Sequence, residues 1–101
     1  SRNGRNGMLF TKNGTINMRN KKWETDFEPI EVDGASKIDT MYSKAYLHHL
    51  FHSQELLALQ LASIHNLAFY LWLVGAARKH IIEGDFTMWK PKMINQMSTR
   101  L

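Results

Sequence analysis

The side chains best suited to chemistry in this sequence are five histidines and a set of arginines. His48, His49 and His52 stand close together, and on a helix His48 and His52 would lie one turn apart, where two imidazoles can bind a metal ion. No carboxylate or third histidine lies within obvious reach of that pair. We therefore expect a polar helix face or a subunit interface here, not a metal site.

The sequence contains no self-contained active site. It has no Ser-His-Asp set, no phosphate-binding glycine loop and no paired carboxylates on one helix face. The Asn-Gly repeats near the start indicate turns, because they lack the strand-to-helix context of a P-loop. We predict no catalytic residue within these 101 residues and no cofactor.

The net charge of +4 conceals a strong segregation along the chain. Residues 1–22 carry six basic side chains and no acid, residues 23–40 carry six acids and one lysine, and residues 41–101 carry six basic and three acidic side chains. A basic head of this kind can neutralise the phosphates of a nucleic acid. Charge alone leaves a solvated basic surface as the alternative.

The elements that must position these residues begin with a hairpin. Strands Met8–Lys12 and Thr15–Arg19 would flank Asn13-Gly14, and Asn-Gly is a strong signal for a type I′ turn. We expect Met8 and Phe10 on one face, with Ile16 and Met18 meeting them from the partner strand. Residues 20–40 are acidic and without a sustained period, which predicts a connection wrapped around the core, anchored by Trp23, Phe27 and Ile30.

From residue 41 onward the apolar spacing is helical. We predict a helix over Ser43–His52, capped by Thr40 or Ser43, and a longer helix capped by Ser53 and reaching Ile82. Gly84 suits a helix stop, and a short final helix should cover Phe86–Thr99. A length of 101 residues fits one small domain or part of a larger one, and the Ser1 start leads us to expect a truncated chain.

The stretch Leu56–Ala77 has no charged residue and is long enough to span a bilayer. Against a membrane span stand four polar residues clustered near its middle: Gln60, Ser63, His65 and Asn66. A completely buried core helix has the same composition. We expect the buried helix and no membrane contact.

Three blocks in a fixed order carry a family resemblance. They are RNGRNGMLFTKNGTINMRN (Arg2–Asn20), YSKAYLHHLF (Tyr42–Phe51) and SIHNLAFY (Ser63–Tyr70). Together they resemble the C-terminal third of bacterial tRNA-guanine transglycosylase (queuine tRNA-ribosyltransferase). The resemblance implies a transferase that exchanges the wobble guanine of tRNA in queuosine biosynthesis, through a covalent ribosyl-aspartate intermediate. It also implies a cytoplasmic, homodimeric enzyme built on a (β/α)₈ barrel.

The resemblance assigns roles to particular residues. Arg2 and Arg5 match family arginines that hold the tRNA anticodon loop, a role suited to a planar guanidinium. Tyr46 and His49 lie on a helix that the family uses in its dimer contact. Both catalytic aspartates would lie before Ser1, so this chain alone should be inactive.

The family also holds a structural zinc with three cysteines and a histidine. His65 occupies the histidine position, but Gly34, Ser36 and Asp39 stand at the cysteine positions. Glycine has no ligand atom and a neutral serine hydroxyl is a poor zinc ligand. We therefore predict that this chain dispenses with the metal and that His65 hydrogen-bonds to the loop around Ser36 and Asp39.

The fold class expected is thus α+β, mainly α-helical with one β-hairpin, as the C-terminal fragment of a (β/α)₈ barrel with a metal-free zinc-type subdomain. Residues 1–40 would form the basic loop, hairpin and acidic connection, and residues 41–101 the helical subdomain. Two other functions stay open: a non-catalytic basic helical module that binds RNA, and a membrane-associated helical fragment.

Overall fold

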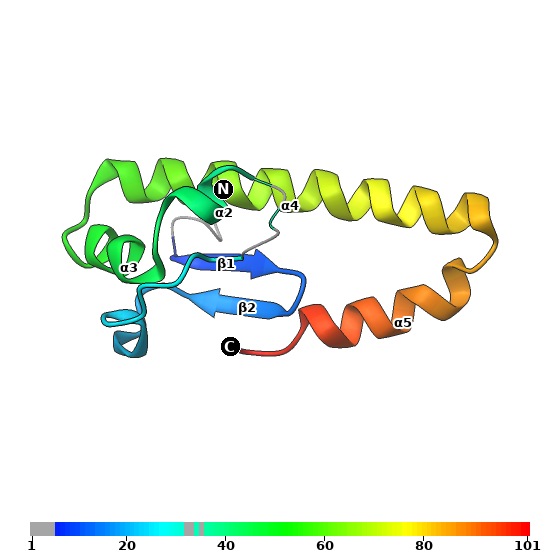
Figure 1. The fold of residues 1–101 in the computed structure, drawn as a ribbon, viewed down its shortest axis with the longest axis horizontal. Coiled ribbons are helices and arrows are strands. Elements are labelled where there is room, and N and C mark those ends of the chain that lie inside the picture. Colours follow the sequence, from blue (N-terminus) through cyan, green and yellow to red (C-terminus); the bar gives the residue numbers. More distant parts are fainter. Residues whose placement is uncertain (1–5, 32–33, 35) are drawn as a thin grey trace.

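A computed structural model describes residues 6–31, 34 and 36–101 of the chain. Its described part is mainly helical and contains one two-stranded antiparallel sheet, as expected (Figure 1). The elements in chain order are strands β1 (Met8–Thr11) and β2 (Gly14–Asn17), the 3₁₀ turn η1 (Lys21–Trp23), and helices α2 (Ile38–Met41), α3 (Lys44–His52), α4 (Leu56–Glu83) and α5 (Phe86–Met97).

The hairpin is present, but its turn and its buried face differ from the prediction. Thr11 pairs with Gly14, so the two turn residues are Lys12 and Asn13, and neither has a positive φ. The Thr11 hydroxyl donates to the Gly14 carbonyl at 2.7 Å and favours this placement. Leu9 therefore faces Ile16 across the strands, and these two are buried while Met8 and Phe10 are half-buried.

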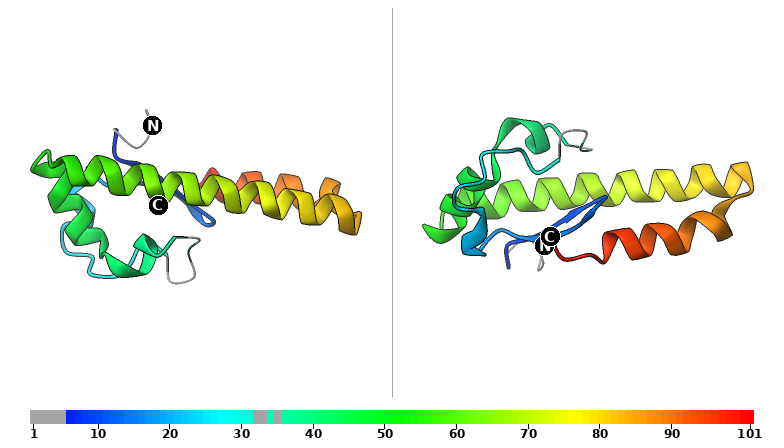
Figure 2. Two further views of the ribbon diagram at one scale, coloured as in Figure 1. Left: turned by 90° about the horizontal axis from the view of Figure 1, so that it is seen from above. Right: turned by 60° about the horizontal axis from the view of Figure 1, so that its bottom comes forward.

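The C-terminal residues cover the outer edge of β2, which local sequence patterns did not predict. The Thr15 amide donates to the Thr99 carbonyl at 2.7 Å, and the Leu101 amide donates to the Thr15 carbonyl at 2.9 Å. Gly14 lies so close to this segment that an added Cβ would sit 2.2 Å from the Thr99 oxygen. Figure 2 shows the C-terminus returning to the hairpin. Both backbone contacts tie β2 to the end of the chain.

The acidic connection packs on the start of α3. Trp23 and Ile30 are buried, as predicted, whereas Phe27 is 77% exposed. The prediction for Phe27 was wrong because the carbonyls on either side of it, Asp26 and Glu28, both accept hydrogen bonds from amides at the start of α3. That pairing turns the backbone inward on both sides of Phe27 and directs its side chain outward.

The helix ends follow the capping rules in part. The Ser43 hydroxyl accepts from the Tyr46 amide and caps α3, as expected, and Gly84 ends α4 in the left-handed conformation (φ 83°). Ser53 does not cap α4. It ends α3, Gln54 then takes a φ of 56°, and α4 begins only at Leu56. The final helix stops two residues earlier than the predicted Thr99.

Helix α4 has two unlike halves. Its buried side chains all lie between Ala58 and Phe69, where they pack on the hairpin and α3. Beyond Phe69 it contacts α5, and the two helices extend past the hairpin as an arm (residues 70–97) in a molecule of 46 × 23 × 21 Å (Figures 1 and 2). The expectation of a completely buried helix was therefore wrong. By length and composition α4 qualifies as a candidate membrane span.

Candidate functional site

The two arginines predicted to contact RNA, Arg2 and Arg5, lie outside the described residues. The described chain enters the fold just after them. The Gly7 carbonyl accepts from the Met18 amide at 2.8 Å, and a Cβ added at Gly7 would lie 3.0 Å from Cγ of Arg19. Gly7, the last residue of the RNGRNG segment, thus lies beside Arg19.

The four positions that the resemblance assigns to a zinc site, Gly34, Ser36, Asp39 and His65, come together in the structure. Asp39 is the centre of the group: its carboxylate accepts from the Ser36 amide at 3.4 Å and is hydrogen-bonded to Nδ1 of His65. A Cβ on Gly34 would fall 1.8 Å from the same carboxylate. The predicted contact between His65 and the loop around Ser36 and Asp39 is confirmed.

Both ring nitrogens of His65 have hydrogen-bond partners. Its Nε2 lies 2.7 Å from the carbonyl oxygen of Phe10, which can only accept, so Nε2 carries a proton and donates it. Its Nδ1 bonds to Asp39, and both side chains are only 1% exposed. The pair joins three elements, namely β1, α2 and α4.

These residues do not fit a zinc ion. Gly34 offers no ligand atom, and a side chain there would collide with the Asp39 carboxylate. Both ring nitrogens of His65 already have partners, and zinc would need one of them with its lone pair exposed. The four positions form a polar, hydrogen-bonded group centred on Asp39. We call this group (Gly34, Ser36, Asp39 and His65) the polar staple.

The free edge of β1 is closed by side chains, a feature that the sequence analysis missed. The side-chain amide of Asn66 accepts from the Phe10 amide at 3.1 Å and donates to the Met8 carbonyl at 2.9 Å. Further along, the Lys12 amide donates to Glu31 at 3.1 Å. The adjacent pair His65-Asn66 inside an uncharged helix was the one available signal, because polar groups in such a position need partners.

Glu31 is a second buried carboxylate in this region, beside Asp39. Its burial raises the pKa of the carboxyl group above the ordinary value of 4.5, and the nearby Asp39 carboxylate acts in the same direction. The hydrogen bond from the Lys12 amide lowers the pKa and opposes part of that shift. The polar staple therefore has a second acid beside it.

The two predicted dimer residues, Tyr46 and His49, are both exposed on α3 but border different hollows. Tyr46 stacks on Tyr42 at 5.5 Å and lines a hollow of about 500 Å³ with Phe27 and Met41. The latter two side chains are largely exposed, so an apolar, aromatic patch surrounds Tyr46. His49 faces the other way and lines a basic groove.

The basic groove lies between η1 and α3 and has a volume of about 760 Å³. His48 and His52, the pair weighed for metal binding, lie in it with their rings stacked at 6.2 Å. Nδ1 of His48 donates to the Met18 carbonyl at 2.7 Å, so this nitrogen is already used in the fold. The remaining lining consists of Arg19, Lys21, Glu24, Thr25, Ala45 and His49.

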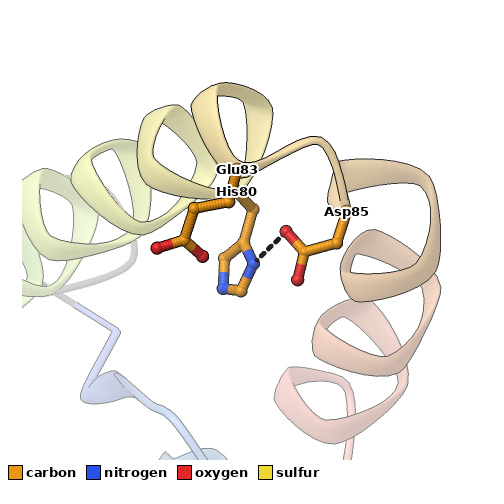
Figure 3. A group of neighbouring side chains, drawn as sticks. All are labelled: His80, Glu83 and Asp85. Carbon is orange, nitrogen blue, oxygen red and sulfur yellow. Dashed lines mark hydrogen bonds and ion pairs between the residues drawn. The ribbon is translucent and has the colours of Figure 1, made fainter.

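A second His–carboxylate group joins the two helices of the arm (Figure 3). Nδ1 of His80 lies 2.8 Å from Asp85, and Glu83 approaches the ring from the other side. The His80 ring also stacks on Trp89 at 4.7 Å. Because these partners already link the end of α4 to the start of α5, we assign the group a structural role in the arm.

Comparison with known proteins shows which family this sequence belongs to. The queuine tRNA-ribosyltransferase family matches the chain over residues 1–99. A queuine tRNA-ribosyltransferase of Helicobacter pylori is 45% identical over 100 residues, which is 99% of this chain and 27% of that protein. That of Lawsonia intracellularis is 43% identical over 93 residues, covering 92% of this chain and 25% of that protein. The chain spans about a quarter of the length of these curated relatives, less than the third expected. The chain belongs to the queuine tRNA-ribosyltransferase family.

Proposed function

We propose that the chain is the C-terminal part of a cytoplasmic tRNA-guanine transglycosylase, completing a (β/α)₈ barrel and exchanging the wobble guanine of tRNA in queuosine biosynthesis. The observation that carries this proposal is the match over residues 1–99. This part supplies tRNA binding and dimer scaffolding, while the catalytic aspartates belong to the rest of the enzyme.

The tRNA anticodon loop is the proposed partner of Arg2 and Arg5. A planar guanidinium binds phosphate through two parallel hydrogen bonds or stacks on an unpaired base, and both modes suit a single-stranded loop. The position of Gly7 beside Arg19 supports this role, since it puts the start of the described chain next to another cation.

The proposed subdomain works without zinc. The polar staple ties α4 and α2 to β1 through two buried hydrogen bonds of one imidazole, which is the kind of constraint that a structural metal supplies. No cofactor is part of the proposal.

Homodimerisation is the second proposed role. The exposed patch around Tyr46 supports it, because stacked aromatic side chains with an apolar rim are typical of interface cores. His49 would lie at the border of this interface, on the side of the basic groove.

A chimeric enzyme tests the proposed function. The C-terminal quarter of the Helicobacter pylori relative is replaced by this chain, and exchange of labelled guanine into tRNA is measured. The chimera should be active, and the isolated chain should not. Replacing Arg2 and Arg5 together by alanine should weaken tRNA binding by about 1–3 kcal/mol for each base that is no longer bound, with unchanged affinity for free guanine.

Lys90→Ala with Lys92→Ala is the matched control, because it removes the same charge from α5. A chimera that folds and dimerises but does not exchange guanine would contradict the assignment to this enzyme. A double arginine variant with wild-type tRNA affinity across a salt titration would remove the assigned RNA contact alone.

A further inference from the structure

The basic groove between η1 and α3 has a lining suited to an anion. Arg19 and Lys21 come from the end of the basic head, and three imidazoles come from one face of α3. Glu24 is the one acid among the lining residues that the structure describes. Counted with neutral histidines, the lining carries a net positive charge.

The fold fixes several of these groups. His48 is held by its hydrogen bond to the Met18 carbonyl and by its stack on His52. The Arg19 guanidinium lies over the Phe51 ring, 5.4 Å from its centre, and its stem packs against Gly7. Such groups lose little side-chain freedom when a ligand arrives, which favours binding.

The size and position of the groove favour a polyanion over a single small ion. Its volume of about 760 Å³ far exceeds what one phosphate fills, and its lining comes from two separate segments of the chain, residues 19–25 and α3. It begins at Arg19, which lies against Gly7, two residues after Arg5 in the sequence. The groove therefore borders Gly7, near the start of the described residues.

We infer that this groove binds the phosphate backbone of RNA, as a second contact surface beside the RNGRNG segment. This inference rests on the proposed function and deepens it, because it adds a sequence-independent contact to the one at the anticodon loop. Backbone contacts fix the position of the nucleic acid while base contacts specify it. The groove accordingly serves affinity and placement, and it does not read the wobble base.

The test measures binding of a fluorescently labelled anticodon stem-loop RNA to the whole chain by anisotropy, over a range of salt concentrations. Arg19→Gln with Lys21→Gln should lower the slope of log affinity against log salt by about one unit or more, since each phosphate contact contributes about 0.7–0.9 units. Lys90→Gln with Lys92→Gln is the control of equal charge on α5 and should leave the slope near wild type. Circular dichroism verifies that both variants fold.

Three further arms separate the outcomes. A stem-loop with adenine at the wobble position should lose as much affinity from the groove variant as the guanine stem-loop does. Inorganic phosphate at matched ionic strength should displace little RNA. Full displacement would show that the groove binds free phosphate and would overturn the inference that it binds an RNA backbone. An Arg2→Gln, Arg5→Gln variant completes the set.

Equal slopes of log affinity against log salt for the groove and control variants would overturn the inference that the groove binds RNA. If only the Arg2, Arg5 variant weakens binding, the groove inference fails while the proposed function stands. If only the groove variant weakens binding, the groove is supported and the assignment of the two arginines fails. If neither variant changes RNA binding, both fail.

Discussion

The two ends of helix α4 show how differently one element can be stabilised. Its first half packs on the hairpin and α3 and supplies His65 and Asn66 to close the edge of β1. Its second half packs against α5 and leaves Leu71, Val74 and Ile81 exposed. Both halves of the helix are rich in apolar residues. Burial is therefore decided by what the rest of the chain brings to each half.

The two halves also contain a matched pair of histidines. His65 and His80 each bond through Nδ1 to an aspartate, but both side chains of the first pair are 1% exposed, whereas those of the second pair are 24% and 49% exposed. Removing one partner of a buried hydrogen-bonded pair is strongly destabilising, while a pair closer to the surface contributes less. Substitutions at such matched positions therefore compare the core directly with the arm.

The largest effect is expected at His65. His65→Ala leaves Asp39 buried without its partner and the Phe10 carbonyl unsatisfied, and it should lower the free energy of unfolding by about 3–5 kcal/mol. His80→Ala should lower it by less than about 1 kcal/mol. Urea denaturation of both variants measures the difference. Similar losses would show that the arm is as tightly coupled to the fold as the core.

A second pair compares two glycines. Gly14 has a φ of 146°, and a Cβ there would lie 2.2 Å from the Thr99 oxygen, so Gly14→Ala should destabilise the chain by about 1–3 kcal/mol. Gly75 lies inside α4 with nothing within 4 Å, so Gly75→Ala should stabilise it by about 0.5–1 kcal/mol. Thermal melts should shift in opposite directions. A tolerated alanine at position 14 would mean that the C-terminal segment does not hold β2.

The smallest effect concerns pH. Burial raises the pKa of Glu31, so the folded chain keeps this proton to higher pH than the unfolded chain does. The stability contributed by the protonated carboxyl group is complete below about pH 4.5 and is lost as the pH rises through the folded-state pKa. Glu31→Gln should remove this loss.

The measurement is urea unfolding of wild type and variant on both sides of that window. Glu31→Gln should gain stability relative to wild type as the pH rises, while Glu83→Gln, an exposed position in the arm, should follow wild type throughout. If the difference in unfolding free energy between wild type and Glu31→Gln does not change with pH, the raised pKa of the Glu31 carboxyl group is contradicted.

Local patterns predicted the parts of the fold that depend on neighbours in sequence. Ser43 caps α3 and Gly84 ends α4 because each acts within one helical turn. The contact of His65 with Asp39 was also predicted, but from the family spacing and not from any local rule. The hairpin was predicted, while its turn was placed one residue late because the Thr11 hydroxyl competes with the Asn-Gly signal.

Apart from the hairpin turn and the start of α4, the missed features depend on contacts between distant segments. Periodicity showed that α4 is apolar but could not show where along its length partners would be present. The exposure of Phe27 follows from backbone pairing with α3, and the closure of β1 by Asn66 joins residues 56 or more positions apart. No short window of sequence contains that information.

The bridge between Thr15 and Arg100 has a consequence for how the protein folds during synthesis. The hairpin is synthesised before the groups that cover its two outer edges: the side chains of α4 for β1, and residues 99–101 for β2. Pairings of such long sequence separation are slow to form, because loop closure costs entropy before the pairing stabilises the chain. Until then the nascent chain carries an open two-stranded ribbon, and a folding partner or a chaperone that shields strand edges would act in that interval.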